Sequence, residues 1–199
     1  MNEQGDFTGT LIDQLNPYAL LVGVFVVVLL AMHGSIFLYL KTEGAMQEKI
    51  KPWMWRTFGT FMVLYMFTTI FTLVAMPHAI ENLRDYPWLW LVPVLNVLAI
   101  ANIPRAIYLE RPGYAFLSSC ATIAALVALL GAALYPNLVT ASNDPALSLT
   151  MLPGSAPSSQ KTLGIMLVIA IIGMPFVLAY TAVIYWTFRG KVELGDHSY

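Results

Sequence analysis

The fold of this chain is decided by a stretch without a charged side chain, residues 162–188, which read TLGIMLVIAIIGMPFVLAYTAVIYWTF. This stretch is 27 residues long, whereas a helix of about 20 apolar residues crosses a bilayer. Four further stretches also lack Asp, Glu, Lys and Arg: residues 14–40, 57–80, 86–104 and 112–143. Because these runs are continuous rather than alternating, they predict membrane helices and not the strands of a barrel. The expected fold class is therefore an all-α, polytopic integral membrane bundle.

The composition excludes several other classes of protein. Of the 199 residues, 58% are hydrophobic and 11% are charged, whereas soluble domains carry about 25% charged residues. The net charge of -1 offers no basic surface for nucleic acid. A single cysteine, Cys120, excludes an intrachain disulfide. No Lys or Arg precedes the first apolar run, so we expect no cleaved signal peptide. A soluble enzyme, a nucleic-acid-binding protein and a secreted disulfide-rich domain are all excluded.

We expect one membrane domain over residues 1–199, with five transmembrane helices. Their expected positions are about residues 18–40, 57–76, 87–104, 114–135 and 162–187. The long outer loop 136–161 contains four prolines and predicts a partly ordered cap over the bundle. Pro93 and Pro175 fall inside the third and fifth of these helices, where they are expected to produce kinks.

The positions of Lys and Arg predict the orientation, because short loops that carry them resist translocation. Eight of the ten fall on one side of the predicted helices: Lys41, Lys49, Lys51, Arg56, Arg105, Arg111, Arg189 and Lys191. Only Arg84 and Lys161 fall on the other side. The N-terminus is therefore predicted to lie outside and the C-terminus in the cytoplasm, as an odd number of helices requires.

One side chain within the predicted helices titrates near neutral pH, and it is His33. An imidazole in this position can hold a haem iron, relay a proton or donate a hydrogen bond to a quinone carbonyl. A hydrogen bond to a neighbouring helix explains it equally well, and we favour that structural interpretation. We expect no catalytic residue, and none of the three histidines shows a metal-ligand spacing with another.

Other residues of the predicted helices favour packing over transport. No Asp or Glu lies within them, which argues against an ion-coupled transporter. Asn96 and Asn102 of the third helix are expected to form hydrogen bonds to other helices. Ala124, Ala128 and Ala132 form a ridge of small residues on the fourth helix, which is typical of close helix packing in lipid.

Short motifs run in order along almost the whole chain, from residue 5 to residue 192. They are GDFTG (5–9), LNPYALLVG (15–23), HG (33–34), YLKTEG (39–44), YPNLV (135–139), SLT (148–150), PFVLAYT (175–181), YW (185–186) and FRGK (188–191). In this order and spacing they resemble the second half of subunit II of the bacterial cytochrome bd-type quinol oxidases.

The resemblance implies a function that the residues alone do not indicate. These oxidases lie in the bacterial inner membrane, oxidise ubiquinol or menaquinol and reduce O2 to water. Their b and d haems are held by subunit I, whereas subunit II carries no haem and completes the heterodimer. We therefore expect no cofactor on this chain, no oxidase activity from the chain alone, and subunit I and membrane lipids as its partners.

The chain departs from the family pattern at its start. The family's subunit II begins with another set of helices, which includes an acidic Gly-Phe-Asp-Phe-Gly type motif. Here Asp6 lies in a different context, before the first apolar run. We expect the chain to be a fragment, a split-gene product or a truncated gene model, with the missing N-terminal half as a further partner. The competing interpretation is a small membrane permease or a transporter half.

Overall fold

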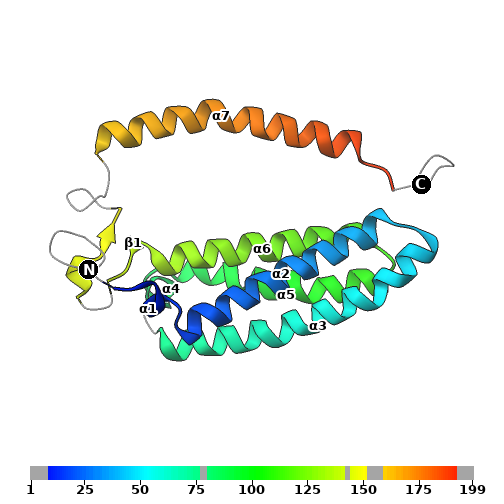
Figure 1. Cartoon of the computed structure of the whole chain (residues 1–199), viewed down its shortest axis with the longest axis horizontal. Coiled ribbons are helices and arrows are strands. Elements are labelled where there is room, and N and C mark those ends of the chain that lie inside the picture. Colours follow the sequence, from blue (N-terminus) through cyan, green and yellow to red (C-terminus); the bar gives the residue numbers. More distant parts are fainter. Residues whose placement is uncertain (1–8, 77–79, 142–143, 152–158, 192–199) are drawn as a thin grey trace.

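The computed structural model describes residues 9–76, 80–141, 144–151 and 159–191. Five helical spans in this part of the chain are long and apolar enough to cross a membrane. They are α2 (Pro17–Lys41), α3 (Gly44–Ala75), the 3-10 helix η2 (Pro87–Trp90) continued by α5 (Leu91–Tyr108), α6 (Pro112–Leu134) and α7 (Gln160–Thr187). The predicted polytopic, helical membrane architecture is confirmed (Figure 1), with a short pair of strands in addition.

Small elements gather at one end of these helices (Figure 1). They are α1 (Leu11–Gln14), α4 (Glu81–Asp85), β1 (Asn137–Val139), the 3-10 helix η3 (Pro145–Leu147) and β2 (Leu149–Thr150). Strands β1 and β2 pair antiparallel, with Asn137 opposite Thr150. Part of the expected loop 136–161 therefore has regular structure, while its residues 142–143 and 152–158 lie outside the described residues.

Helices α2, α3, α5 and α6 form a four-helix bundle. Helix α5 packs along α6, and α2 packs along both α3 and α6 (Figure 1). Large apolar side chains fill the space between the four helices. The buried members of this core are Phe25, Leu29, Met32, Ile36, Met54, Phe61, Ile100, Ile103, Ala106, Ile107 and Ala115.

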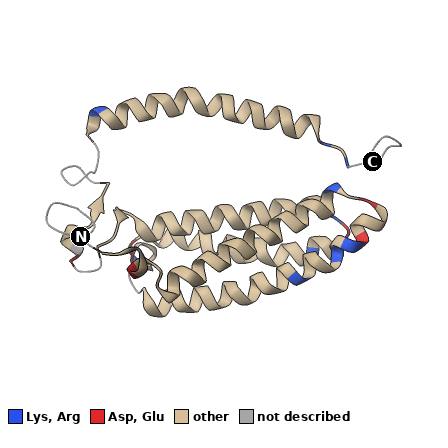
Figure 2. Ribbon diagram, in the orientation of Figure 1, with Lys and Arg blue, Asp and Glu red and all other residues tan. Residues whose placement is uncertain are grey.

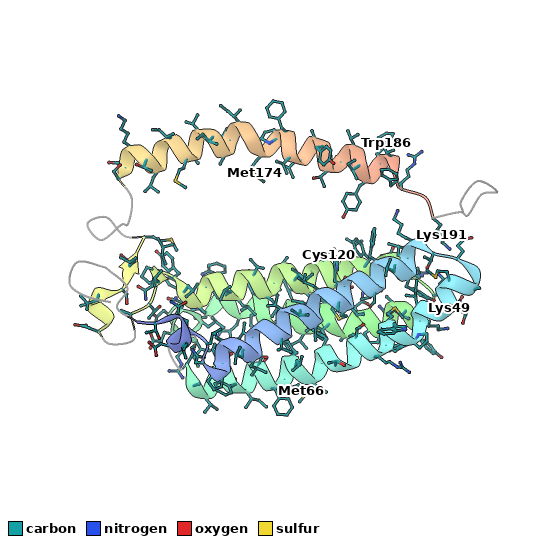
Figure 3. The ribbon with its side chains drawn as sticks, in the orientation of Figure 1. Lys49, Met66, Cys120, Met174, Trp186 and Lys191 are labelled. Carbon is teal, nitrogen blue, oxygen red and sulfur yellow. The ribbon has the colours of Figure 1, made fainter. Side chains whose placement is uncertain are left out.

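Helix α7 lies apart from the bundle, and none of its residues is buried. Its side chains, Met174 and Trp186 among them, project on all sides with no helix packed against them (Figure 3). The chain just after the helix contacts the bundle: Lys41 Nζ donates to the carbonyl oxygens of Phe188 (2.6 Å) and Gly190 (3.1 Å). Nearby, Lys191 forms an ion pair with Glu43 at 2.8 Å. Helix α7 is thus attached to the α2–α3 turn at its C-terminal end.

The second membrane helix is longer than predicted. It was expected over residues 57–76, but α3 begins at Gly44 and carries Lys49, Lys51 and Arg56, which were placed in a loop. Charge keeps such a segment out of lipid but does not oppose helix formation, since Met, Gln, Glu and Lys all have good helix propensity. The hydropathy pattern therefore marks only the part of α3 that lies in the membrane.

Pro93 is the third residue of α5 and lies within the continuous span Pro87–Tyr108, as expected. Because η2 precedes α5, this proline falls just after the change from 3-10 to α-helix. Pro104 is a second proline inside α5. Pro175 does lie inside α7, as expected, and α7 follows an arc in Figure 1.

Basic side chains gather at the end of the bundle that carries the α2–α3 turn (Figure 2). Lys161, by contrast, lies at the opposite end, where α7 begins. Basic residues are thus concentrated at one end of the helices, as the sequence predicted. Which of the two ends faces the cytoplasm stays a prediction.

Candidate functional site

The face of α6 that lies toward the interior of the bundle carries small hydroxyl side chains. Ser118, Ser119 and Thr122 are all buried. Thr122 Oγ1 donates to the carbonyl oxygen of Ser118 (3.0 Å), and Ser119 Oγ donates to that of Phe116 (2.7 Å). These bonds to the preceding turn of the same helix satisfy the hydroxyl protons without a partner from outside. Helix α6 therefore presents hydroxyl oxygens to the helices beside it.

His33 of α2 uses one of these oxygens. Its Nδ1 lies 2.8 Å from Ser119 Oγ, and its ring stacks on Phe116 with centroids 4.9 Å apart. Because the single proton of the Ser119 hydroxyl is donated to Phe116, the His33 Nδ1–H must be the donor of this bond. The imidazole consequently carries a proton on Nδ1, and the bond joins α2 to α6. A contact of His33 with a proton path or a quinone stays a prediction.

The ring of His33 contacts a phenylalanine and a serine of α6. The residues that contact its ring on α6, Phe116 and Ser119, offer no side chain that ligates iron. Within the described ranges, no group of three or more His, Cys, Asp and Glu side chains is placed to hold a metal ion. The contacts shown for His33 are therefore a hydrogen bond and a ring contact with α6.

The two asparagines of α5 bond to different helices. Asn102 Nδ2 donates to Ser118 Oγ of α6 (2.8 Å), and its Oδ1 accepts from Arg105 (3.1 Å). Asn96 Nδ2 donates to the hydroxyl of Tyr65 on α3 at 3.5 Å. The expected interhelical bonds of both asparagines are confirmed.

A model of the family described as cytochrome bd terminal oxidase subunit II matches residues 1–188. The chain belongs to that family. Its place in this family of membrane proteins agrees with the five helices that are long and apolar enough to cross a membrane.

Curated relatives of this family member are similar along most of its length. It is 26% identical to the cytochrome bd-I ubiquinol oxidase subunit 2 of Escherichia coli K12, with 96% of this chain and 56% of the relative covered. It is 27% identical to a probable cytochrome oxidase subunit 2 of Haemophilus influenzae, with the same coverage. For the cytochrome bd ubiquinol oxidase subunit 2 of Bacillus subtilis the identity is 24%, with 91% and 52% covered. The chain spans about half the length of these relatives.

The predicted alanine ridge of α6 does not face the interior of the bundle. Ala124 and Ala128 are exposed and Ala132 is only half-buried. The buried stripe of α6 consists instead of Ala115, Ser118, Ser119 and Thr122. Sequence reasoning missed the hydroxyl residues of this stripe; the signal that could have found them is the recurrence of small polar residues at positions 118, 119 and 122 within an apolar run.

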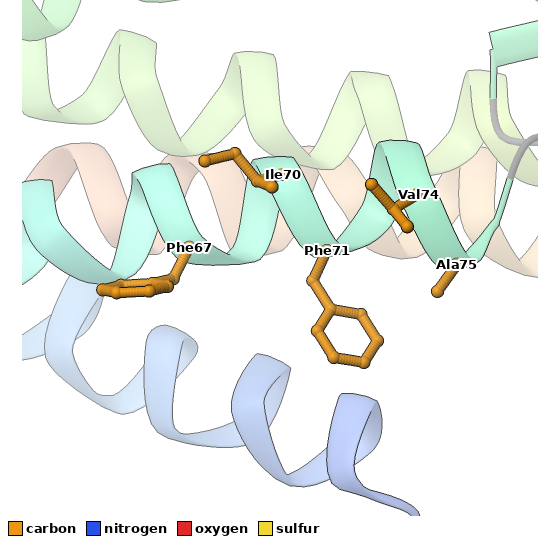
Figure 4. A pocket seen from close by; sticks show the side chains of 5 residues that line it. All are labelled: Phe67, Ile70, Phe71, Val74 and Ala75. Carbon is orange, nitrogen blue, oxygen red and sulfur yellow. The ribbon is translucent and has the colours of Figure 1, made fainter.

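The outward surface of α3 carries a shallow apolar hollow (Figure 4). It is lined by Phe67, Ile70, Phe71, Val74 and Ala75. Phe71 also stacks on Tyr18 of α2, with ring centroids 5.4 Å apart. Since all five lining side chains are apolar, the hollow supplies no catalytic or ligating group and suits contact with lipid chains.

Proposed function

We propose that this chain is the non-haem part of a cytochrome bd-type terminal oxidase, which oxidises ubiquinol or menaquinol and reduces O2 to water. The single observation that carries this proposal is the family match over residues 1–188. In the proposed complex, subunit I holds the b and d haems, and this chain supports the assembly from within the bacterial inner membrane.

The geometry of the chain supports a structural part rather than a catalytic one. Hydroxyl, amide and imidazole groups in its described, mainly apolar interior join helices to one another, as in the bonds of His33 to Ser119 and Asn102 to Ser118. Side chains of this kind help to hold a membrane bundle together through hydrogen bonds between helices. We assign no catalytic residue to the chain.

Helix α7 supports a role in assembly. Its side chains are exposed on every face, and it packs against no other helix of the described chain. In lipid, helices associate through close packing and hydrogen bonds rather than through the hydrophobic effect. We propose that helices of subunit I and of the remaining half of subunit II lie beside α7, and that this chain corresponds to the second half.

Co-expression tests the proposal. The chain, carrying an affinity tag, is produced alone, with subunit I, and with subunit I plus a polypeptide for the other half of subunit II. The complete set is expected to yield a d-type haem spectrum in fixed ratio to the chain and quinol-dependent O2 uptake, whereas the chain alone yields neither.

Two results would contradict the proposal. Quinol-dependent O2 uptake by the purified chain alone would place catalysis on this chain. A haem-free preparation that transports a solute into vesicles, with no binding to subunit I, would support the permease interpretation instead.

A further inference from the structure

One amide oxygen in the centre of the bundle lacks a hydrogen-bond partner among the described residues. Asn96 of α5 is 0% exposed, and its Oδ1 atom has no partner among the described residues. Rotating the amide by half a turn exchanges its oxygen and nitrogen and leaves the nitrogen without an acceptor instead. An unsatisfied buried polar atom costs about 1–3 kcal/mol. The unsatisfied oxygen of Asn96 therefore indicates a hydrogen-bond donor that the described chain does not itself supply.

The bond that Asn96 does form is long. Its Nδ2 lies 3.5 Å from the Tyr65 hydroxyl, whereas N–H···O bonds are commonly about 2.9–3.0 Å. This is the one side-chain hydrogen bond between α3 and α5 in the described part of the chain. Polar groups at such a separation are often joined better through a water molecule than directly.

A second unsatisfied group lies on the same helix as Tyr65. The Thr68 hydroxyl is buried and has no partner among the described residues. Thr68 follows Tyr65 by three residues, so the two side chains lie on one face of α3. Asn96, Tyr65 and Thr68 together offer an amide and two hydroxyls, which matches the roughly three hydrogen bonds that a buried water makes.

The burial of Asn96 limits what the ligand can be. Because the side chain is enclosed by this chain alone, no helix of a partner subunit and no lipid can reach its amide. Only a small molecule that both donates and accepts fits, and water is the one present at high concentration. We propose that Asn96, Tyr65 and Thr68 bind a water molecule between α3 and α5, near the middle of the membrane.

The same face of α3 continues toward the end of the bundle that carries α4. Thr72 lies one turn beyond Thr68, donates to the Thr68 carbonyl oxygen (2.7 Å) and lies 2.9 Å from the hydroxyl of Tyr18. The hydroxyls of Tyr18 and Thr72 thus extend the polar face of α3 by one turn beyond Thr68. Thr69, on the exposed side of α3, donates back to the Tyr65 carbonyl (2.7 Å) and takes no part in this face.

Radiolytic footprinting tests the site on the protein as purified from its membranes. Hydroxyl radicals formed from a bound water oxidise the side chains beside it, and mass spectrometry measures the modified fraction of each. We expect Tyr65 to be modified while Phe61, an aromatic ring fully buried one turn away, stays protected. In the Asn96→Leu variant, which keeps the branched shape of the side chain but not its polar atoms, modification of Tyr65 should fall below its level in the unmutated protein.

Asn102→Leu is the matched control. It removes an asparagine from the same helix that already has its partner in Ser118, so modification of Tyr65 should match that of the unmutated protein. Protection of Tyr65 in the unmutated protein, or equal modification of Tyr65 with and without the Asn96 amide, would overturn the proposal.

A map of the unmutated protein gives a test that does not depend on variants. Electron cryo-microscopy at a resolution where ordered waters are visible should show isolated density within hydrogen-bond distance of the Asn96 amide. A protein side chain in that position would overturn the proposal.

Discussion

His33 illustrates how a single residue that suggests a cofactor can act in packing. The imidazole donates through Nδ1 to Ser119 and lies against Phe116, so two residues of α6 hold it. A histidine in lipid is a functional candidate by default because polar groups there are costly. The hydrogen bond removes much of that cost, and the residue then joins α2 to α6.

We predict that His33→Ala lowers the free energy of unfolding by about 0.6–2 kcal/mol, the range of interhelical hydrogen bonds in membranes. Ser119→Ala removes the same bond and should have a similar effect. The double variant should lose less than the sum of the two, because the bond can be lost only once. Thermal unfolding in one detergent measures all four proteins.

The same substitution also tests the haem interpretation. In a complex assembled with subunit I, His33→Ala should leave every haem absorption band in place. The loss of one haem band from a complex that is still assembled would show that His33 ligates iron.

Among the individual elements, the α2–α3 turn depends on one glycine. Gly44, the first residue of α3, has φ of +56°, a conformation that residues with a Cβ atom rarely adopt. No atom lies within 4 Å of where its Cβ would be, so the requirement comes from the backbone and not from packing.

We predict that Gly44→Ala destabilises the chain by about 1–2 kcal/mol, the cost of a left-handed conformation for an L-residue. Gly59 lies inside the same helix with equally open space, so it is the matched control. Gly59→Ala should be neutral or stabilising by about 0.5–1 kcal/mol, because alanine favours the helix. Thermal unfolding compares the two, and equal effects would contradict the prediction.

Helix α7 is held by contacts of the same turn. Lys41 donates to two carbonyl oxygens beyond the helix, and Glu43 pairs with Lys191. Because both residues of the ion pair are largely exposed, at 44% for Lys191 and 59% for Glu43, the pair contributes little free energy. The ion pair does show that the chain after α7 lies beside the α2–α3 turn.

We predict that cysteines replacing Glu43 and Lys191, in a Cys120→Ser background, form a disulfide in oxidised membranes. The control pairs Lys191→Cys with Trp53→Cys, which lies nine residues into α3 from Gly44 and thus about 13 Å along the helix. A mobility shift after mild oxidation reports the link. Equal cross-linking of the two pairs would contradict the attachment of α7 at this turn.

At the scale of the whole molecule, the distribution of basic residues predicts the orientation of the chain in the membrane. Basic residues gather at one end of the helices (Figure 2), and the positive-inside rule places that end in the cytoplasm. We predict that, in the same cysteine-free background, Asp144→Cys is modified by an impermeant thiol reagent from outside whereas Ala45→Cys is not. Both positions are exposed, so access is set by the membrane alone. Labelling of Ala45→Cys but not of Asp144→Cys would show that the chain has the opposite orientation in the membrane.

The sequence by itself determined the class of fold and the number of membrane helices. The reason is that each helix must cross the same bilayer thickness and satisfy its own backbone hydrogen bonds, so each segment can be interpreted without its neighbours. The same independence explains the error at α3: hydropathy detects the part in lipid, whereas helix formation continues into water as far as Gly44.

Only the tertiary structure decided which polar residues meet and which helix is left without neighbours. The sequence marked His33, Asn96 and Asn102 as groups that need partners, but their partners lie on other helices, and for His33 the partner is 86 residues away. Helix α7 carries the same apolar signal as α2, yet it packs against nothing in the described chain. Hydropathy measures preference for lipid over water, and a neighbouring helix is as apolar as lipid, so the choice between them depends on packing between particular surfaces.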